Sequence, residues 1–260
     1  MGYTDSKLVS YKKISPHKTS PRNHKIDTIT IHCMAGNLSV ETCGNVFQTR
    51  QASSNYGIGS DGRIALYVDE KDRSWATSSS SNDNRAVTIE VANDGGADTG
   101  WHVSDKAMKS LIELIADICK RNDIKKLKWS TNKSDRINHK NGCNMTVHRD
   151  YANKSCPGDY LYGKHSYIAK EVNKKLKSTS STTSTTDSKP TSAASASKEF
   201  KVKVIVNDLN IRKEPNANSD KVGCISNKGI YTITKTSGSW GYLKSGAGWI
   251  NISTKYVQKL

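Results

Sequence analysis

A single low-complexity segment divides this chain. Residues 178–197 read STSSTTSTTDSKPTSAASAS, and 14 of these 20 residues are Ser or Thr. Such a segment has almost no apolar surface to bury against the entropy of ordering, so it predicts a flexible linker with a root-mean-square span of roughly 25 Å. We therefore expect two folded parts, residues 1–177 and residues 198–260.

Both expected parts are basic. The formal net charge of the 260-residue chain is +16; residues 1–177 carry 28 basic and 19 acidic side chains, and residues 198–260 carry 11 and 4. This excess favours polyanionic partners such as nucleic acid, anionic lipid or acidic cell-wall polymer, and does not choose among them. No nucleic-acid motif accompanies the charge, so we expect no specific nucleic-acid partner.

Apolar runs are short throughout the chain. None approaches the roughly 18 consecutive apolar residues that a membrane-spanning helix needs, so no transmembrane segment is predicted. The first 30 residues lack the apolar stretch of a secretory signal, which predicts a protein made in the cytoplasm without a signal peptide. Six cysteines without a Cys-x-x-Cys pair indicate neither a disulfide scaffold nor a zinc ribbon.

Strand and helix patterns interleave in the first part. Residues 26–32 and 86–91 are β-branched runs that alternate apolar with polar side chains, which predicts strands. Residues 55–59 and 63–68 flank Ser60-Asp61-Gly62 and predict a hairpin. Ser104 is placed to cap a helix with apolar residues at three- and four-residue spacing. The part is therefore predicted to be α/β, and the period of 2 allows His32 and Glu90 to share one sheet face.

Three potential metal ligands lie far apart in the sequence. His32 ends the first predicted strand, and His148 and Cys156 come more than 100 residues later. Two imidazoles and a thiolate suit a zinc site that leaves a fourth, tetrahedral position open for water. Spacing alone favours a plainer interpretation, a loop histidine and a buried small cysteine, because His-x7-Cys is not a diagnostic zinc motif.

Four segments in this order carry a family resemblance: ITIH at 29–32, NYGI leading into DGRI at 55–64, VTIEV at 87–91, and HRD followed by KSCPG at 148–158. With them, residues from about 26 to 175 resemble the zinc N-acetylmuramoyl-L-alanine amidase type 2 family, whose fold is shared with peptidoglycan recognition proteins. The resemblance implies a mixed central β-sheet flanked by helices.

The same resemblance implies the site residues. It implies Zn²⁺ held by His32, His148 and Cys156, the last position being Cys in some members and Asp in others. It also implies a catalytic carboxylate at Glu90 and a catalytic cation at Lys154. Zinc lowers the pKa of its water from 15.7 to roughly 7, a nearby carboxylate can pass the proton to the departing nitrogen, and a cation can stabilise the oxyanion.

Several of these residues have a structural alternative. Glu90 could instead pair with a neighbour such as Arg85, and Lys154 could be a solvated lysine. Tyr56 matches a tyrosine that some members place beside the metal, where its phenol would donate to the oxyanion; packing within the sheet is the alternative.

Trp75 and His102 are the expected substrate contacts, with a core position as the alternative for Trp75. Cys33 adjoins His32, so strand alternation is expected to turn it away from the metal. The remaining histidines are expected at the surface or in loops: His17, His24, His139 and His165.

The second part has its own pattern. Short strands separated by Gly, Asn and Pro turns predict a small all-β barrel. The segments LNIR at 209–212 followed by Pro215, KG at 228–229, Trp240, and GWI at 248–250 resemble the bacterial SH3 domain family over nearly all of residues 200–260. The resemblance implies a cell-wall-binding domain. Of Trp240, Tyr242 and Trp249, at most one is expected to be contact surface and the others to be core.

Together these features predict a zinc-dependent amidase that cleaves the bond between the lactyl group of N-acetylmuramic acid and the L-alanine of the stem peptide. The expected order is a catalytic domain (1–177), a flexible linker (178–197) and an SH3-like wall-binding domain (198–260). This order resembles a phage endolysin that acts, after release, on the peptidoglycan of a Gram-positive cell wall. A host autolysin and a non-catalytic muropeptide-binding protein are the alternatives, and the oligomeric state stays open.

Overall fold

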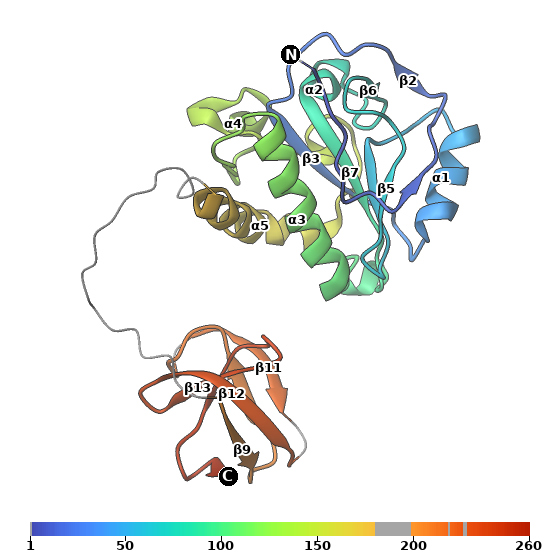
Figure 1. The fold of residues 1–260 in the computed structure, drawn as a ribbon. Helices are drawn as coiled ribbons and strands as arrows, with labels where there is room; N and C mark the ends of the chain where they lie inside the picture. The colour runs from blue at the N-terminus through green and yellow to red at the C-terminus, as the bar shows by residue number, and fades with distance from the viewer. Residues whose placement is uncertain (1, 180–198, 218, 226–227) are drawn as a thin grey trace. The chain divides into compact units, whose positions relative to one another are not determined.

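The computed structural model of the chain describes residues 2–179, 199–217, 219–225 and 228–260. The chain folds as two compact units, Met1–Thr185 and Thr186–Leu260 (Figure 1). The predicted linker lies outside the described residues except at 178–179, which end helix α5 (Gly158–Thr179). In the part of the chain that the structure describes, no helix combines the length and apolar character that crossing a bilayer requires.

A six-stranded mixed sheet forms the centre of the first unit, in the order β1-β5-β4-β7-β3-β8. Strands β4, β7, β3 and β8 run parallel to one another, whereas β5 is antiparallel to β4 and parallel to β1. The predicted α/β class with a mixed sheet is confirmed. The strand bounds are β1 Tyr11–Lys12, β3 Thr28–Cys33, β4 Tyr56–Ile58, β5 Ile64–Leu66, β7 Ala86–Val91 and β8 Met145–Val147.

Helices cover both faces of this sheet. In β5, Ile64 and Leu66 belong to the apolar cluster formed with α3 (Asp105–Arg121) and α5, whereas Ala65 between them belongs to the cluster formed with α1 (Val40–Thr49). Successive residues of a strand point to opposite faces, so α1 lies on the face opposite α3 and α5. Figure 1 shows α3 and α5 side by side, with α1 across the sheet.

The central strands β3 and β7 place the site on the α1 face. Their parallel register pairs His32 with Glu90, which confirms that these two residues share a face. Ile31 and Ile89 belong to the cluster formed with α3 and α5, so their neighbours His32 and Glu90 point the other way.

Two local predictions are confirmed in the connections. Ser104 Oγ accepts a hydrogen bond from the Ala107 N–H at 3.1 Å and caps α3. The predicted hairpin is β4 and β5, with Tyr56 opposite Leu66. The remaining elements of this unit are β2 Lys18–Thr19, β6 Arg73–Ser74, α2 Ser80–Arg85, α4 Lys133–Ile137 and the 3-10 helices η1 Ala97–Thr99, η2 Lys140–Gly142 and η3 His148–Asp150.

The second unit is a seven-stranded sheet in the order β11-β10-β14-β13-β12-β9-β15, with neighbouring strands antiparallel. One apolar cluster fills its inner face. The predicted small all-β domain is therefore present. The strands are β9 Phe200–Val204, β10 Leu209–Arg212, β11 Lys221–Ile225, β12 Ile230–Ser237, β13 Trp240–Leu243, β14 Trp249–Asn251 and β15 Val257–Lys259.

The aromatic residues of β13 and β14 differ from the expectation. Trp240, Tyr242 and Trp249 are all half-buried and lie outside the apolar cluster of this unit, whereas the sequence predicts at most one of them outside the core. The reason is strand alternation: their neighbours Leu243 and Ile250 fill the inner face, so the rings project from the outer one.

Candidate metal centre

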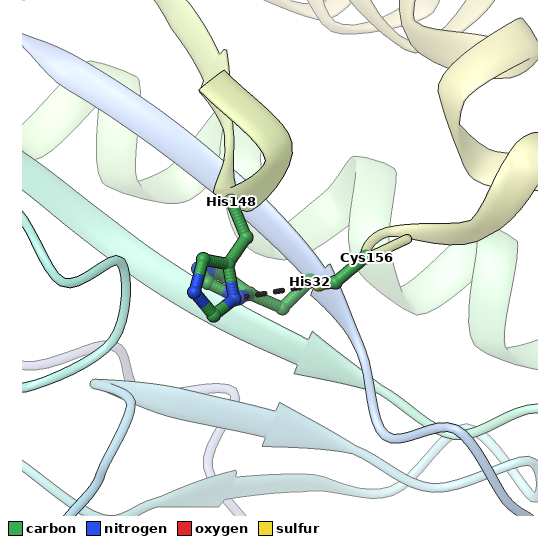
Figure 2. Close-up of side chains that lie close together, drawn as sticks. All are labelled: His32, His148 and Cys156. Carbon is green, nitrogen blue, oxygen red and sulfur yellow. Dashed lines mark hydrogen bonds between the residues drawn. The ribbon is translucent and has the colours of Figure 1, made fainter. Parts of the chain in front are cut away.

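Three sequence-distant side chains meet at the carboxyl ends of β3 and β8. His32 is the fifth residue of β3, and His148 directly follows β8, whose Val147 pairs with Ile31. Cys156 comes from the loop before α5. One ligand atom from each of the three residues lies within 4.8 Å of the others. Figure 2 shows the three side chains close together. Parallel pairing of β3 with β8 thus brings together residues that are more than 100 positions apart.

The three residues form a set of potential metal donors, and one ring nitrogen of each histidine has no hydrogen-bond partner among the described residues. His32 Nδ1 lies 3.4 Å from Cys156 Sγ, and the two imidazole centroids are 5.1 Å apart. The Nε2 atoms of His32 and His148 are buried and have no hydrogen-bond partner within the described residues. Buried polar atoms are normally satisfied, so such a pair beside a thiol fits a metal-ion site.

Burial keeps both imidazoles in the form that binds a metal. Loss of solvent, together with the charge of His148, lowers the pKa of His32 to about 3. Loss of solvent also lowers the pKa of His148, although Asp83 opposes the shift. Both rings are therefore neutral at pH 7, with a lone pair free for coordination.

Cys33 lies closer to the site than expected. Its backbone N–H points to Cys156 Sγ at an N–S distance of 3.5 Å, and the residue lines the same cavity. Its side chain nevertheless belongs to the apolar cluster of Ile29 and Ile31, which is the face opposite His32 that alternation predicts.

A buried ion pair holds the loop that carries His148. Arg136 is 2% exposed, and its guanidinium donates to both oxygens of Asp150 at 2.8 and 2.6 Å. Asp150 Oδ2 also accepts from the Val147 N–H at 3.2 Å, across the first turn of η3. Sequence analysis missed Arg136, because no spacing signal links it to a loop 14 residues later.

Arg149 connects the segment that carries His148 with the segment that carries Cys156. The Arg149 N–H donates to the Cys156 carbonyl at 3.2 Å, and its guanidinium donates to the Ser155 carbonyl and to Asp159. The segment between His148 and Cys156 is therefore closed on itself, which fixes the separation of the two ligands.

Glu90 stands beside the donor set. Its Oε1 is 3.8 Å from His32 Nδ1, its side chain is 18% exposed, and its Oε2 is buried without a hydrogen-bond partner among the described residues. Burial, reinforced by Cys33 and opposed by Arg50, raises the pKa of Glu90 well above its ordinary value. The alternative of an ion pair with Arg85 is excluded, because Arg85 pairs with Asp27 at 2.7 Å.

A cavity of about 390 Å³ opens onto this centre from the α1 side. Its wall includes Glu90, His148 and Cys156 together with Lys154 and Trp75, two residues selected from the sequence. Trp75 is 36% exposed. Helix α1 and the residues just after it supply a wall that sequence analysis missed: Val46, Phe47, Arg50 and Ala52.

Tyr56 does not reach the centre. Its register partner is Ile89, so it points to the face opposite Glu90, and it is fully buried. Its phenol donates to Glu70 Oε1 at 2.6 Å and accepts from the Ser6 N–H at 2.9 Å. The expectation of a phenol beside the metal is corrected in favour of the alternative, packing within the sheet.

Two histidines also differ from their expected surroundings. His102 is not among the cavity residues; its Nδ1 is 2.6 Å from Asp94 Oδ1, and its ring is 4.4 Å from that of Tyr160. His165, expected at the surface or in a loop, is fully buried in α5, 4.2 Å from the ring of Trp129. Helical periodicity turns it inward there.

Comparison with known proteins gives one family. A model of the N-acetylmuramoyl-L-alanine amidases (Amidase_2) matches residues 22–159, whereas no curated protein sequence matches. Solved structures that resemble the chain include a mutant endolysin from Bacillus subtilis, with 16% identity over 62% of this chain and 97% of that chain and a TM-score of 0.47. The endolysin amidase LysCS from Clostridium intestinale URNW has 18% identity over 64% and 98%, with a TM-score of 0.43.

The family model matches just over half of the chain, and its range contains His32, Glu90, His148, Lys154 and Cys156. This chain belongs to the N-acetylmuramoyl-L-alanine amidase family.

Proposed function

We propose that this amidase is zinc-dependent, with His32, His148 and Cys156 as the protein ligands. The observation that carries the proposal is the convergence of these three donors within 4.8 Å of one another, beside a cavity lined by His148, Cys156 and Glu90. Two nitrogens and one sulfur are a donor set that zinc accepts in catalytic sites with one open position. When bound, zinc supplies a Lewis acid and a water whose pKa is roughly 7.

Glu90 is the proposed general base and acid. Its carboxyl group is close to the donor set, and within the described residues no hydrogen bond competes for Oε2. A pKa raised by burial brings a carboxyl group nearer to the working pH, where it can accept a proton from water and return it to the departing amide nitrogen.

Lys154 and Trp75 are proposed to act on the substrate. Lys154 lies in the cavity wall two residues before Cys156, where an ammonium group can stabilise the oxyanion of the tetrahedral intermediate. Trp75 offers a partly exposed ring in the same wall, against which an apolar part of the substrate can pack.

The substrate follows from family membership: the amide between N-acetylmuramic acid and the L-alanine of the stem peptide in peptidoglycan. We further propose that the chain is a phage endolysin that acts on a Gram-positive wall, with an SH3-like wall-binding domain in residues 198–260. The order of the two units supports this proposal, and a host autolysin with the same chemistry is the alternative.

Mass spectrometry of digested cell wall tests the activity. Cleavage of the proposed bond creates a new free amino terminus on alanine without new reducing sugar ends. New reducing ends would indicate a glycosidase, and binding to walls without any new terminus would favour a non-catalytic muropeptide-binding protein.

A further inference from the structure

One row of side chains crosses the outer face of the second unit. The strand register pairs Lys221 with Arg212, Arg212 with Trp249, Trp249 with Tyr242, and Tyr242 with Lys235. Residues directly opposite one another on neighbouring strands project from the same face. These five residues, the basic-aromatic row, therefore lie side by side across strands β11, β10, β14, β13 and β12.

The centre of the row is aromatic and is not part of the core. Tyr242 and Trp249 meet edge to face with their ring centroids 5.3 Å apart, and the Tyr242 hydroxyl donates to the Gly246 carbonyl at 3.1 Å. Gly248 has a φ of +137°, and a Cβ there would lie 2.6 Å from the Arg212 carbonyl oxygen. Only glycine permits this approach of β14 to β10, which sets Trp249 beside Arg212.

The flanks of the row are cationic and free of ion pairs. Among the described residues, none of its three cations forms an ion pair, whereas Glu199 and Asp220 pair with Lys244 and Lys213 outside the row. Lys221 and Lys235 are exposed at the two ends. Exposed cations without partners raise the local concentration of anions.

The spacing of the row selects the kind of ligand. Neighbouring strands are roughly 4.8 Å apart, so the four steps from Lys221 to Lys235 span about 19 Å, with the ring pair in between. One carboxylate or phosphate cannot meet cations at both ends. An extended chain can, if its anionic groups repeat and the units between them pack on the rings of Tyr242 and Trp249.

We propose that the basic-aromatic row binds an anionic glycopolymer of the cell wall, in which phosphate groups alternate with sugar or polyol units. The choice of a wall polymer rests on the proposed function of the first unit, and charge complementarity with the row supports it. Such binding would keep the amidase on the wall without adding a catalytic contact.

Cosedimentation with purified cell walls tests the proposal. The full chain is used in the Glu90→Gln background, so that the walls are not digested, before and after hydrofluoric acid has removed the phosphodiester-linked polymers. The test variant is Lys221→Gln/Lys235→Gln, and the matched control is Lys201→Gln/Lys203→Gln, which removes two exposed charges from β9. Thermal unfolding confirms that each variant is folded.

The expected result is that the test variant binds intact walls roughly tenfold more weakly at low salt. The negative slope of log affinity against log salt should become shallower by about 2, because binding with two fewer phosphate contacts releases fewer counterions. Extracted walls should bind the parent chain weakly and the test variant equally weakly. Trp249→Ala should lower the binding that remains at high salt.

Three results would overturn the proposal. The first is a test variant that binds walls as its β9 control does. The second is extracted walls that bind as tightly as intact ones, which would assign the row to the peptide of peptidoglycan. The third is a test variant that is no longer retained on a DNA column although it binds walls as the parent chain does. Cleavage of a soluble muropeptide by the otherwise native chain reports separately on the proposed amidase function, so the two failures are distinguishable.

Discussion

Glu90 and Glu70 are two glutamates of one domain with opposite surroundings. Glu70 is fully buried, and its two oxygens accept from Tyr56, from both terminal nitrogens of Arg121 and from Asn122. Glu90 faces the cavity, and its Oε2 has no hydrogen-bond partner in the described ranges. A satisfied carboxylate holds structure together, whereas an unsatisfied one beside a cavity is available for chemistry.

Replacing each of these glutamates by Gln separates the two roles. Glu90→Gln should lower the rate of muropeptide cleavage at least about 100-fold, because proton transfer is lost, while zinc content and stability stay near those of the parent. Glu70→Gln should instead destabilise the first unit by about 3 kcal/mol, because it removes the buried carboxylate of the pair with Arg121 and leaves only the half-buried Asp117 as its charge partner. Cleavage assays and urea unfolding of both variants distinguish the catalytic role from the structural one. A Glu90→Gln chain that still cleaves at the parent rate would refute the catalytic role of Glu90.

His165 makes the stability of the first unit depend on pH. Burial lowers its pKa to about 4, from about 6.5 in an unfolded chain. Between these values the unfolded state binds more protons, so the free energy of unfolding should fall as the pH falls from about 6.5 to 4, by up to about 3 kcal/mol from this residue. His165→Gln should reduce the slope in urea unfolding at pH 7, 5.5 and 4.5; an unchanged slope would contradict the assignment.

At the scale of elements, the site depends on how short segments are held. The 3-10 helix η3 carries His148, and the Arg136–Asp150 pair fixes it from α4. The guanidinium of Arg136 also lies 4.6 Å from the ring centroid of Trp129. A three-residue helix has little stability of its own, so this buried pair sets the position of a proposed metal ligand.

Asp150→Asn should destabilise the first unit by about 3–5 kcal/mol, because it leaves the buried Arg136 charge without a counterion. It should also weaken zinc binding, although Asp150 is not a ligand. Urea unfolding and competitive zinc titration measure both effects. Lys12→Gln is the control: it breaks the exposed pair with Asp69 and should cost less than about 1 kcal/mol. Equal losses in the free energy of unfolding for the two variants would contradict a dominant role of the buried Arg136–Asp150 pair.

Sequence periodicity predicted the elements that place the centre. Alternation in β3 and β7 put His32 and Glu90 on one face, and the Ser104 cap marked the start of α3, because these signals are local. Sequence patterns do not reach positions that depend on tertiary contacts. Arg136 meets Asp150 only in the folded chain, and the resemblance that suggested Tyr56 did not specify the sheet face on which its ring lies.

At the scale of the whole molecule, we propose that catalysis and wall binding belong to different units. Each unit has its own apolar cluster, and the boundary between them falls between residues 185 and 186. The proposed metal ligands and the cavity lie in the first unit, and the basic-aromatic row lies in the second.

A chain ending at residue 185 should therefore cleave a soluble muropeptide at a rate within about twofold of the full chain, whereas its lysis of intact walls should fall roughly tenfold or more, because the second binding event is no longer intramolecular. The two assays are run on the same preparations, with zinc content as the control for folding. Equal losses in both assays would mean that the second unit completes the active site.

The central claim is that His32, His148 and Cys156 hold one zinc ion. X-ray absorption at the zinc edge of the purified full chain tests it most directly. We predict one zinc per chain with one sulfur neighbour at about 2.3 Å and two imidazole nitrogens at about 2.0 Å, and loss of the sulfur signal in Cys156→Ala but not in Cys224→Ala. A zinc shell without sulfur, or a sulfur signal that persists in Cys156→Ala, would contradict the account.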